Sequence, residues 1–275
     1  MEIGAALLQA ARRLEAANVA VPRLTAEVLL AAVLERPRVY LYAHPEEPLA
    51  PAAEARYREF LEARLEGRPT QYLTGRQEFY GREFHVTPAV LIPRPETEHV
   101  VEAALETARG ARRIVDAGCG SGILAVTLRL ETGAETWGTD ISPAALAVAA
   151  QNARRLGAPV NFVACDLLAA FPDASFDLVV SNPPYVPDRD RPGLQREVRD
   201  FEPHVALFAG PTGYEIYERL VADARRVLRP GGLLVTELGF GTYGRVLAML
   251  GDGWRDARTL PDLAGIPRVA AAVRR

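Results

Sequence analysis

The first 70 residues or so repeat apolar and polar positions with the period of an α-helix. In segment 3–14 the apolar side chains recur every three or four positions, and the charged ones lie off that face. We expect a second helix over about residues 25–34 and a third that begins with Pro51 in its first turn and stops at Gly67. The pattern predicts a small helical bundle, which we assign to residues 1–72.

The pattern changes after the bundle. Between residues 74 and 92, aromatic and β-branched side chains flank Gly81, which predicts a β-hairpin linker, assigned to residues 73–92. From residue 93 to residue 275, strand-like and helix-like segments alternate. This order is typical of an α/β domain with a mostly parallel, doubly wound, Rossmann-like sheet and helices on both faces. The predicted strands lie within residues 111–118, 134–141, 160–166, 176–184 and 231–239.

Composition and charge exclude several classes of protein. The chain is 49% hydrophobic and 24% charged, which is an ordinary globular balance. Its net charge is −3, and the first 70 residues or so carry about nine Arg against ten Glu, so we expect no direct nucleic-acid binding. All 32 basic residues are Arg, which excludes a catalytic lysine, a Schiff base and a P-loop.

Cysteine and histidine content narrows the possible cofactors. The two cysteines and four histidines show no spacing typical of a zinc site, so we expect no metal.

The amino-terminal segment has no basic region before its apolar stretch, and the continuous apolar runs are far shorter than a bilayer span. We therefore expect a cytoplasmic protein without a membrane partner, and separately we expect a monomer.

Candidate ligand-binding residues follow the predicted strands, because ligands of an open parallel sheet bind at the carboxyl ends of its strands. A glycine-rich loop follows the first strand, with Asp116 two positions upstream of it. A dinucleotide-binding loop would have its third glycine at Ile123. A carboxylate beside the loop instead suits a cationic ligand such as S-adenosylmethionine, which carries an amino group and no phosphate. A purely structural turn is the alternative. The loop residues are Gly118, Cys119, Gly120, Ser121 and Gly122.

Acidic residues also end the next two strands. Asp140 can accept hydrogen bonds from both hydroxyls of a ribose, or it can cap the helix that begins near Ser142. Asp166 can accept a hydrogen bond from the amino group of adenine while Leu167 packs on the ring, or it can cap the next helix. A loop and two acids at successive strand ends together indicate a nucleoside ligand, and therefore a methyl donor.

The fourth strand ends in Asn182, Pro183, Pro184 and Tyr185. Asn-Pro and Pro-Pro are ordinary turn formers, but their place beside the same crevice gives them a second interpretation. The side-chain carbonyl of Asn182 and the main-chain carbonyl of Pro183 can hold both N–H groups of a planar nitrogen and direct its lone pair at a methyl group. The prolines preorganise these acceptors, and Tyr185 offers a flat face for stacking. We call residues 182–185 the amide clamp.

A methyl-donor fold with the sequence NPPY resembles the amino-methyltransferases, which modify adenine N6, guanine N2 or glutamine N5. Three further stretches resemble the release factor glutamine methyltransferase family. They are residues 69–98, which contain the sequence RPETE, residues 201–217 and residues 262–269. An amino-terminal helical bundle also fits this family, so the resemblance covers essentially the whole chain.

The resemblance implies a function. It implies methylation, by S-adenosylmethionine, of the glutamine in the Gly-Gly-Gln motif of class I peptide chain release factors, with the helical bundle helping to engage the factor. By their match to the family motifs, the glycine-rich loop, Asp140, Leu167 and Asn182 would contact the donor. The amide clamp would hold the target glutamine.

Other residues of the matching stretches have less specific roles. Arg94, Thr97 and Glu98, in RPETE, are expected to border the donor pocket or to start a helix. Glu237, at the end of a late strand, is either structural or functional. At Leu167 relatives can carry an aromatic residue, so we expect weaker stacking on adenine here.

Two other functions are compatible with parts of this pattern. An adenine-N6 DNA or guanine-N2 RNA methyltransferase shares NPPY, but it needs a phosphate-binding surface that the near-neutral bundle does not offer. A non-enzymatic, ribosome-associated protein with a vestigial fold is the second alternative, and the intact loop, acids and clamp argue against it. The methyl acceptor separates the two enzymes, and donor binding separates an enzyme from a vestigial fold.

Overall fold

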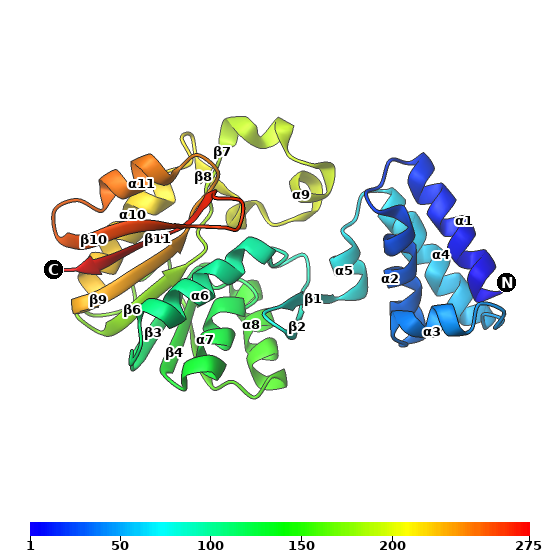
Figure 1. Ribbon diagram of the computed structural model, residues 1–275, viewed down its shortest axis with the longest axis horizontal. Coiled ribbons are helices and arrows are strands. Elements are labelled where there is room, and N and C mark those ends of the chain that lie inside the picture. Colours follow the sequence, from blue (N-terminus) through cyan, green and yellow to red (C-terminus); the bar gives the residue numbers. More distant parts are fainter. The chain divides into compact units, whose positions relative to one another are not determined.

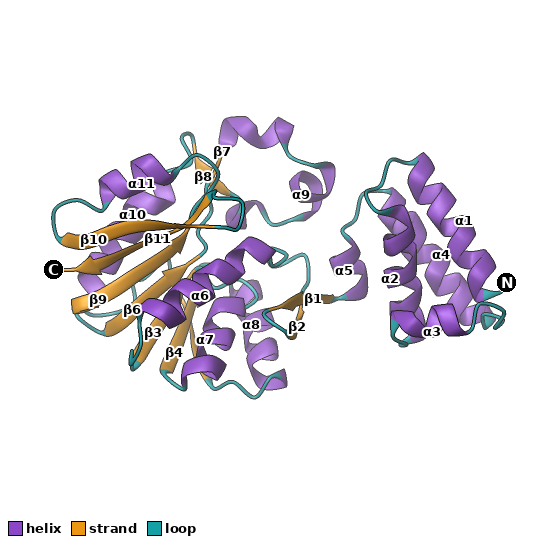
Figure 2. Cartoon of the chain, in the orientation of Figure 1, coloured by secondary structure: helices purple, strands orange, loops and turns teal.

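The computed structural model describes residues 1–275. The chain forms two compact units, residues 1–76 with 195–201, and residues 77–194 with 202–275. The first unit is helical, and the second contains the large sheet (Figures 1 and 2). Neither unit has a helix that is both long and apolar enough to cross a membrane.

The first unit contains the predicted helical bundle. Its helices are α1 (Ile3–Ala16), α2 (Pro22–Leu34), α3 (Arg38–Ala43), α4 (Pro51–Leu65) and α5 (Thr70–Thr74). Apolar side chains of α1 to α4 form one buried cluster. Proline in the first turn of α2 and α4 suits a helix start, because its missing N–H would have no partner there. The pattern did not predict α3 and α5, which are too short to show a helical period.

A short helix from far along the chain completes the first unit. The helix α9 (Arg196–Phe201) places Glu197 2.8 Å from the buried guanidinium of Arg64 on α4. A Cβ atom at Gly67 would lie 3.4 Å from the ring of Phe201, and the φ of Gly67 is +100°. The glycine that ends α4 therefore also leaves room for α9. The contacts thus add to the bundle a segment that lies far outside residues 1–72.

The predicted hairpin consists of β1 (Arg76–Phe79) and β2 (Arg82–His85). Its turn residues, Tyr80 and Gly81, both have positive φ, 51° and 69°, as the twist of a two-residue hairpin turn requires. Phe79 on β1 is buried in the core of the second unit. The segment predicted as a linker thus packs, from residue 77 onward, as part of the second unit.

The strands of the large sheet are β3 (Arg113–Ala117), β4 (Glu135–Asp140), β5 (Val160–Ala164), β6 (Phe176–Ser181), β9 (Leu228–Glu237), β10 (Trp254–Pro261) and β11 (Pro267–Arg274). Their order is β10-β11-β9-β6-β3-β4-β5. The strands from β5 to β9 in this order are parallel, and only β11 runs against its neighbours. The predicted mostly parallel sheet is confirmed, whereas the pattern did not predict β10 and β11. The strand order reverses beside β3, which places the ligand crevice at the carboxyl ends of the central strands.

Helices cover both faces of this sheet (Figure 2). Ile114 belongs to one buried core and the next residue, Val115, belongs to the other, because successive side chains of a strand point to opposite faces. The first core contains residues of α6 (Glu98–Thr107), α7 (Ile123–Thr132) and α8 (Pro143–Arg155), and the second contains residues of α10 (Glu215–Val227) and α11 (Tyr243–Met249). Shorter elements are η1 (Pro95–Thr97), β7 (Val186–Pro187), η2 (Asp188–Gly193), η3 (His204–Ala206) and β8 (Phe208–Gly210).

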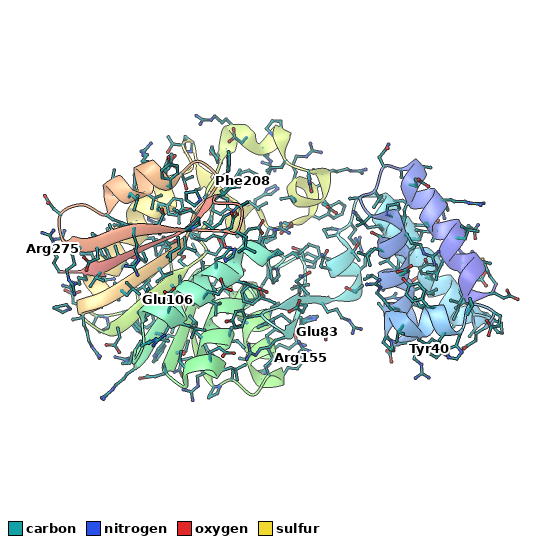
Figure 3. The ribbon with its side chains drawn as sticks, in the orientation of Figure 1. Tyr40, Glu83, Glu106, Arg155, Phe208 and Arg275 are labelled. Atoms are coloured by element: carbon teal, nitrogen blue, oxygen red, sulfur yellow. The ribbon has the colours of Figure 1, made fainter.

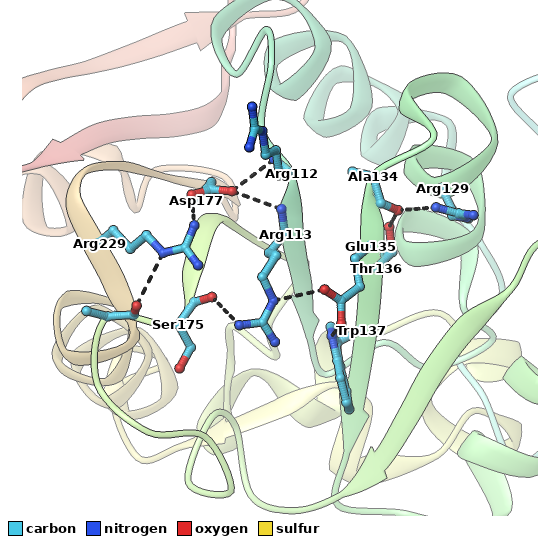
Figure 4. Close-up of polar contacts among 11 residues, drawn as sticks. Arg112, Arg113, Arg129, Ala134, Glu135, Thr136, Trp137, Ser175, Asp177 and Arg229 are labelled. Atoms are coloured by element: carbon cyan, nitrogen blue, oxygen red, sulfur yellow. Dashed lines mark hydrogen bonds and ion pairs between the residues drawn. The ribbon is translucent and has the colours of Figure 1, made fainter.

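Asp177 joins the amino ends of three strands (Figure 4). Its carboxylate accepts hydrogen bonds of 2.9 Å from the backbone N–H groups of Arg112 and Arg113, and it forms an ion pair of 2.7 Å with Arg229 on β9. Burial alone would raise the pKa of Asp177, but these partners outweigh burial and hold it below its ordinary value. The contacts fix β3, β6 and β9 at the end of the sheet opposite the crevice.

Candidate functional site

One cavity of the second unit gathers residues from four strand ends. The predicted residues that line it are Asp116, Gly118, Cys119, Gly120, Ser121, Asp140, Asp166, Leu167, Asn182 and Pro184. They lie at or just after the ends of β6, β3, β4 and β5, which are four consecutive strands of the sheet. The parallel sheet thus brings the candidate donor-binding loop, both acids and part of the amide clamp to the same space.

The glycine-rich loop has a backbone that only glycine adopts readily. Gly118, Gly120 and Gly122 have φ values of 73°, 53° and 83°. A Cβ atom at Gly122 would lie 3.1 Å from the Cβ of Ala149 on α8, so glycine also permits close helix packing. The backbone N–H of Gly120 donates to Asp140 Oδ2 at 2.9 Å, which ties the loop to the next strand end.

Asp116 is a buried carboxyl group with one unpaired oxygen. Its Oδ2 accepts a hydrogen bond of 3.1 Å from the N–H of Ala125, whereas the buried Oδ1 has no partner. Burial raises the pKa of Asp116 to about 8; the Ala125 bond opposes this rise, and the nearby Asp140 adds to it. An unpaired carboxyl oxygen on the cavity wall fits a cationic group, such as the amino group of S-adenosylmethionine.

Helix capping was the alternative to ligand binding for Asp140 and Asp166, but neither residue caps a helix. The cap of α8 is Ser142, whose Oγ accepts from the N–H of Ala145 at 3.2 Å. Asp140 accepts one backbone N–H on each oxygen, which leaves each oxygen a further lone pair. Asp166 pairs with Arg219 of α10, and a turn rather than a helix follows it.

Leu167 has an unusual backbone for its type. Its φ is +46°, in the left-handed region, and its side chain is 9% exposed. This conformation costs an L-residue roughly 1–2 kcal/mol, which the surrounding packing must offset. In this conformation Leu167 lies on the cavity wall. The structure brings together no group of three or more His, Cys, Asp or Glu side chains suited to a metal ion.

Side chains from distant segments support the amide clamp. Asn182 Nδ2 donates to Thr97 Oγ1 at 3.1 Å, and the hydroxyl of Tyr185 lies 3.4 Å from Glu237 Oε1. A Cβ atom at Gly239 would lie 2.7 Å from the ring of Tyr185, so the ring packs directly on a glycine backbone. Asn182 and Tyr185 are therefore held in place by the segment after β2 and by the end of β9 with the residues that follow it.

The RPETE segment has three different roles in the structure. Thr97 is fully buried behind Asn182. Arg94 forms an ion pair with the buried Glu202, which lies in the matching stretch 201–217. Glu98 begins α6, as the alternative interpretation proposed, and accepts from the N–H of Tyr80 at 2.8 Å. The lining of the cavity reaches Pro93 and does not include the three residues predicted to border it.

The sequence interpretation did not find Asn152 of α8. Asn152 is fully buried; its Oδ1 accepts from the N–H of His85 at 2.7 Å, and its Nδ2 donates to the carbonyls of His85 and Ser121 at 2.9 Å. It therefore joins the end of the hairpin to the glycine-rich loop. Arg155 adds an ion pair to Glu83 of the hairpin (Figure 3). An asparagine on the apolar face of an amphipathic helix was the signal for this role.

Known protein families match both parts of the chain. A PrmC N-terminal domain model matches residues 5–75, and a methyltransferase domain model matches residues 114–201. A release factor glutamine methyltransferase of Koribacter versatilis is 46% identical over 273 residues, covering 98% of this chain and 97% of the relative. The chain belongs to the release factor glutamine methyltransferase family. Another member, from Moorella thermoacetica, is 47% identical over 284 residues and covers 100% of this chain and 99% of the relative.

Solved structures of methyltransferases share the fold. A Pyrococcus furiosus methyltransferase aligns with a TM-score of 0.53 at 17% identity, covering 71% of this chain and 90% of that chain. A T. thermophilus 16S rRNA methyltransferase in complex with AdoMet and guanosine aligns with a TM-score of 0.54 at 22% identity, covering 73% and 50%. At these identities the likeness concerns the fold alone, and it confirms the predicted Rossmann-like methyltransferase architecture of this family member.

Proposed function

We propose that this protein transfers a methyl group from S-adenosylmethionine to the side-chain N5 of the glutamine in the Gly-Gly-Gln motif of class I peptide chain release factors. One observation carries the proposal. Asn182 and Pro184 of the amide clamp line the same cavity as Asp116 and Asp140, so a donor site and an acceptor site adjoin. The names of the relatives support the choice of acceptor.

The donor side of the cavity has complementary groups for each part of the donor. When bound, S-adenosylmethionine supplies an electrophilic methyl group on a sulfonium. Asp116 would pair with the amino group, and the free lone pairs of Asp140 would accept from the ribose hydroxyls. Asp166 and Leu167 would contact the adenine, as proposed from the strand order.

The amide clamp would prepare the acceptor. The lone pair of an amide nitrogen is delocalised, so it attacks a methyl group poorly. The carbonyls of Asn182 and Pro183 would accept the two N–H groups of the glutamine, orient the nitrogen and stabilise the positive charge that develops on it. Tyr185 would stack on the planar amide. The proton leaves after methyl transfer, so no strong base is needed.

The helical bundle would engage the release factor. This proposal rests on the match of residues 5–75 to the PrmC N-terminal domain and on the near-neutral charge of the bundle, which suits a protein partner better than a phosphate backbone.

Transfer of a labelled methyl group to a purified class I release factor tests the proposed function. The factor with Gln→Ala in its Gly-Gly-Gln motif, total RNA and duplex DNA serve as parallel acceptors. We expect label on the wild-type factor alone, and its loss with the Asn182→Ala enzyme. Label on nucleic acid with an unlabelled factor would leave the clamp in place but overturn the choice of acceptor.

A further inference from the structure

A chain of two hydrogen bonds leads from the amide clamp into the core. Asn182 Nδ2 donates to Thr97 Oγ1 at 3.1 Å, and Thr97 Oγ1 donates to Glu237 Oε2 at 2.6 Å. Thr97 is 0% exposed and Glu237 is 3% exposed. Water therefore does not compete for these bonds, and each buried polar atom depends on its neighbour in the chain.

The chemistry of Glu237, Thr97 and Asn182 determines which group donates and which accepts in each of the two hydrogen bonds. A carboxylate can only accept hydrogen bonds, so the single hydroxyl proton of Thr97 is committed to Glu237. The hydroxyl can then only accept from the side chain in front of it. Asn182 must therefore turn its NH₂ group toward Thr97, and its carbonyl oxygen is left for another donor. An asparagine without this chain could rotate its amide by half a turn.

We propose that Glu237, acting through Thr97, is a positioning residue that holds the amide of Asn182 with its carbonyl oxygen available to the substrate amide. This inference rests on the proposed function, because the N–H groups of a glutamine side chain need acceptors. With the amide reversed, the NH₂ group of Asn182 would meet the NH₂ group of the substrate, and neither could accept.

The position of Glu237 suits this role. It lies at the carboxyl end of β9, and its backbone carbonyl accepts from the hydroxyl of Tyr217 at 2.9 Å. The same Tyr217 hydroxyl accepts from the N–H of Gly239 at 3.1 Å, so the backbone that directly follows the Glu237 side chain is fixed. Glu237 also faces the hydroxyl of Tyr185, and burial raises the pKa of that phenol, so it stays protonated and can donate. One carboxylate thus supports two members of the clamp.

The donor and acceptor roles in these two hydrogen bonds depend on whether the carboxyl group of Glu237 is protonated. Burial raises the pKa of Glu237 to about 7; the bonds from Thr97 and Tyr185 and the charge of Arg268 oppose this rise, and the charge of Glu96 adds to it. A protonated carboxyl group can itself donate to Thr97. The hydroxyl of Thr97 is then free to donate toward Asn182, and the orientation of the amide is no longer fixed. The clamp should therefore lose its preorganisation as the pH falls below about 7.

A matched set of variants of the full-length enzyme tests this hydrogen-bond relay, which runs from Glu237 through Thr97 to Asn182. Thr97→Val removes the bridging hydroxyl at constant shape, and Thr97→Ser restores it. Thr127→Val is the control, because Thr127 is equally buried but its hydroxyl has no partner. We expect Thr97→Val to lower kcat for the release factor at least about tenfold, with donor affinity unchanged in calorimetry. Thr97→Ser and Thr127→Val should stay within a few-fold of the wild type.

The pH dependence separates positioning from a merely structural role. The wild-type kcat should rise with increasing pH, with an apparent pKa near 7. This rising limb of the pH–rate profile should be absent in Glu237→Gln, whose side chain does not titrate. Full kcat in Thr97→Val, an equal loss of donor affinity, or a persistent limb in Glu237→Gln would each overturn the relay.

A readout without substrate keeps the relay and the proposed function separate. In ¹⁵N-labelled protein, the side-chain NH₂ signal of Asn182, assigned by its loss in Asn182→Ala, should shift with a midpoint near pH 7. Thr97→Val should abolish that shift. If the shift is observed but no release factor is methylated, the proposed function fails and the relay stands. If the factor is methylated but the signal does not titrate, the relay fails and the function stands.

Discussion

Replacing Asp116 by asparagine should make the free protein more stable and its donor binding weaker. The carboxyl group is fully buried, and only one of its oxygens has a hydrogen-bond partner, the N–H of Ala125. Asparagine keeps the shape, can accept the same bond, and has no charge to bury. A buried carboxyl group without a cation must take up a proton on folding or remain as an uncompensated charge, and either state costs stability as long as the cation is absent.

The pKa gives the size and sign of this effect. The pKa of Asp116 is about 8 in the folded chain, against an ordinary value of 3.8. A raised folded-state pKa contributes stability that is fully present below the unfolded pKa and is lost as the pH rises through the folded one. Between pH 4 and pH 7 the wild type should lose up to about 4 kcal/mol relative to Asp116→Asn, at about 1.4 kcal/mol per pH unit.

Urea unfolding of both proteins at several pH values between 5 and 8, without donor, measures the difference. Calorimetric titration with S-adenosylmethionine at pH 8 should show at least about tenfold weaker binding for the variant, because its side chain no longer pairs with the amino group. Two results would refute the reasoning that Asp116 is an unpaired carboxyl group with a raised pKa. One is a variant that is less stable than the wild type at pH 7, and the other is a stability difference that does not change with pH.

Three further substitutions test the supports of the site and of the sheet. Asn152→Ala leaves buried backbone groups of the hairpin and the glycine-rich loop unpaired, so we expect a loss of about 3 kcal/mol in urea unfolding and weaker donor binding in calorimetry; unchanged donor binding would show that the loop holds its own shape. Gly239→Ala should displace the ring of Tyr185 and lower kcat/KM for the release factor at least about tenfold at unchanged donor affinity, and unaltered kinetics would contradict that packing. Asp177→Asn should lower the free energy of unfolding at pH 7 by about 1–2 kcal/mol. Because the folded pKa is depressed, this deficit should vanish as the pH falls through it, and a deficit independent of pH would contradict the role of the charge.

Much of the fold follows from local patterns in the sequence. The helical period marks α1, α2 and α4, and continuous apolar runs that end in polar or glycine-rich turns mark the parallel strands. The pattern does not predict β10, because most of its side chains are exposed and the strand lies at the sheet edge. Such a strand need not alternate apolar and polar residues, so its existence depends on pairing with β11 rather than on its own sequence.

The candidate donor site was predictable for a related reason. The cavity-lining residues Asp140, Asp166 and Asn182 each lie at the end of a predicted strand, and parallel strands place such ends at one edge. The alternative roles could not be separated in the same way. Whether Asp140 or Ser142 caps α8 depends on side-chain geometry, and the strained backbone of Leu167 has no signature in the residue type.

The sequence by itself determined the longer helices, the parallel strands in their order along the chain and the chemistry at each strand end, because these depend on neighbours a few positions apart. Only the tertiary structure decided which side chains meet across long separations. Thr97 lies 85 positions from Asn182 and 140 positions from Glu237, yet the three form one buried chain. Helix α9 likewise joins a unit whose other residues precede it by more than a hundred positions. Local propensity does not encode such contacts; they arise when the folded sheet and its helices bury polar groups that must find partners.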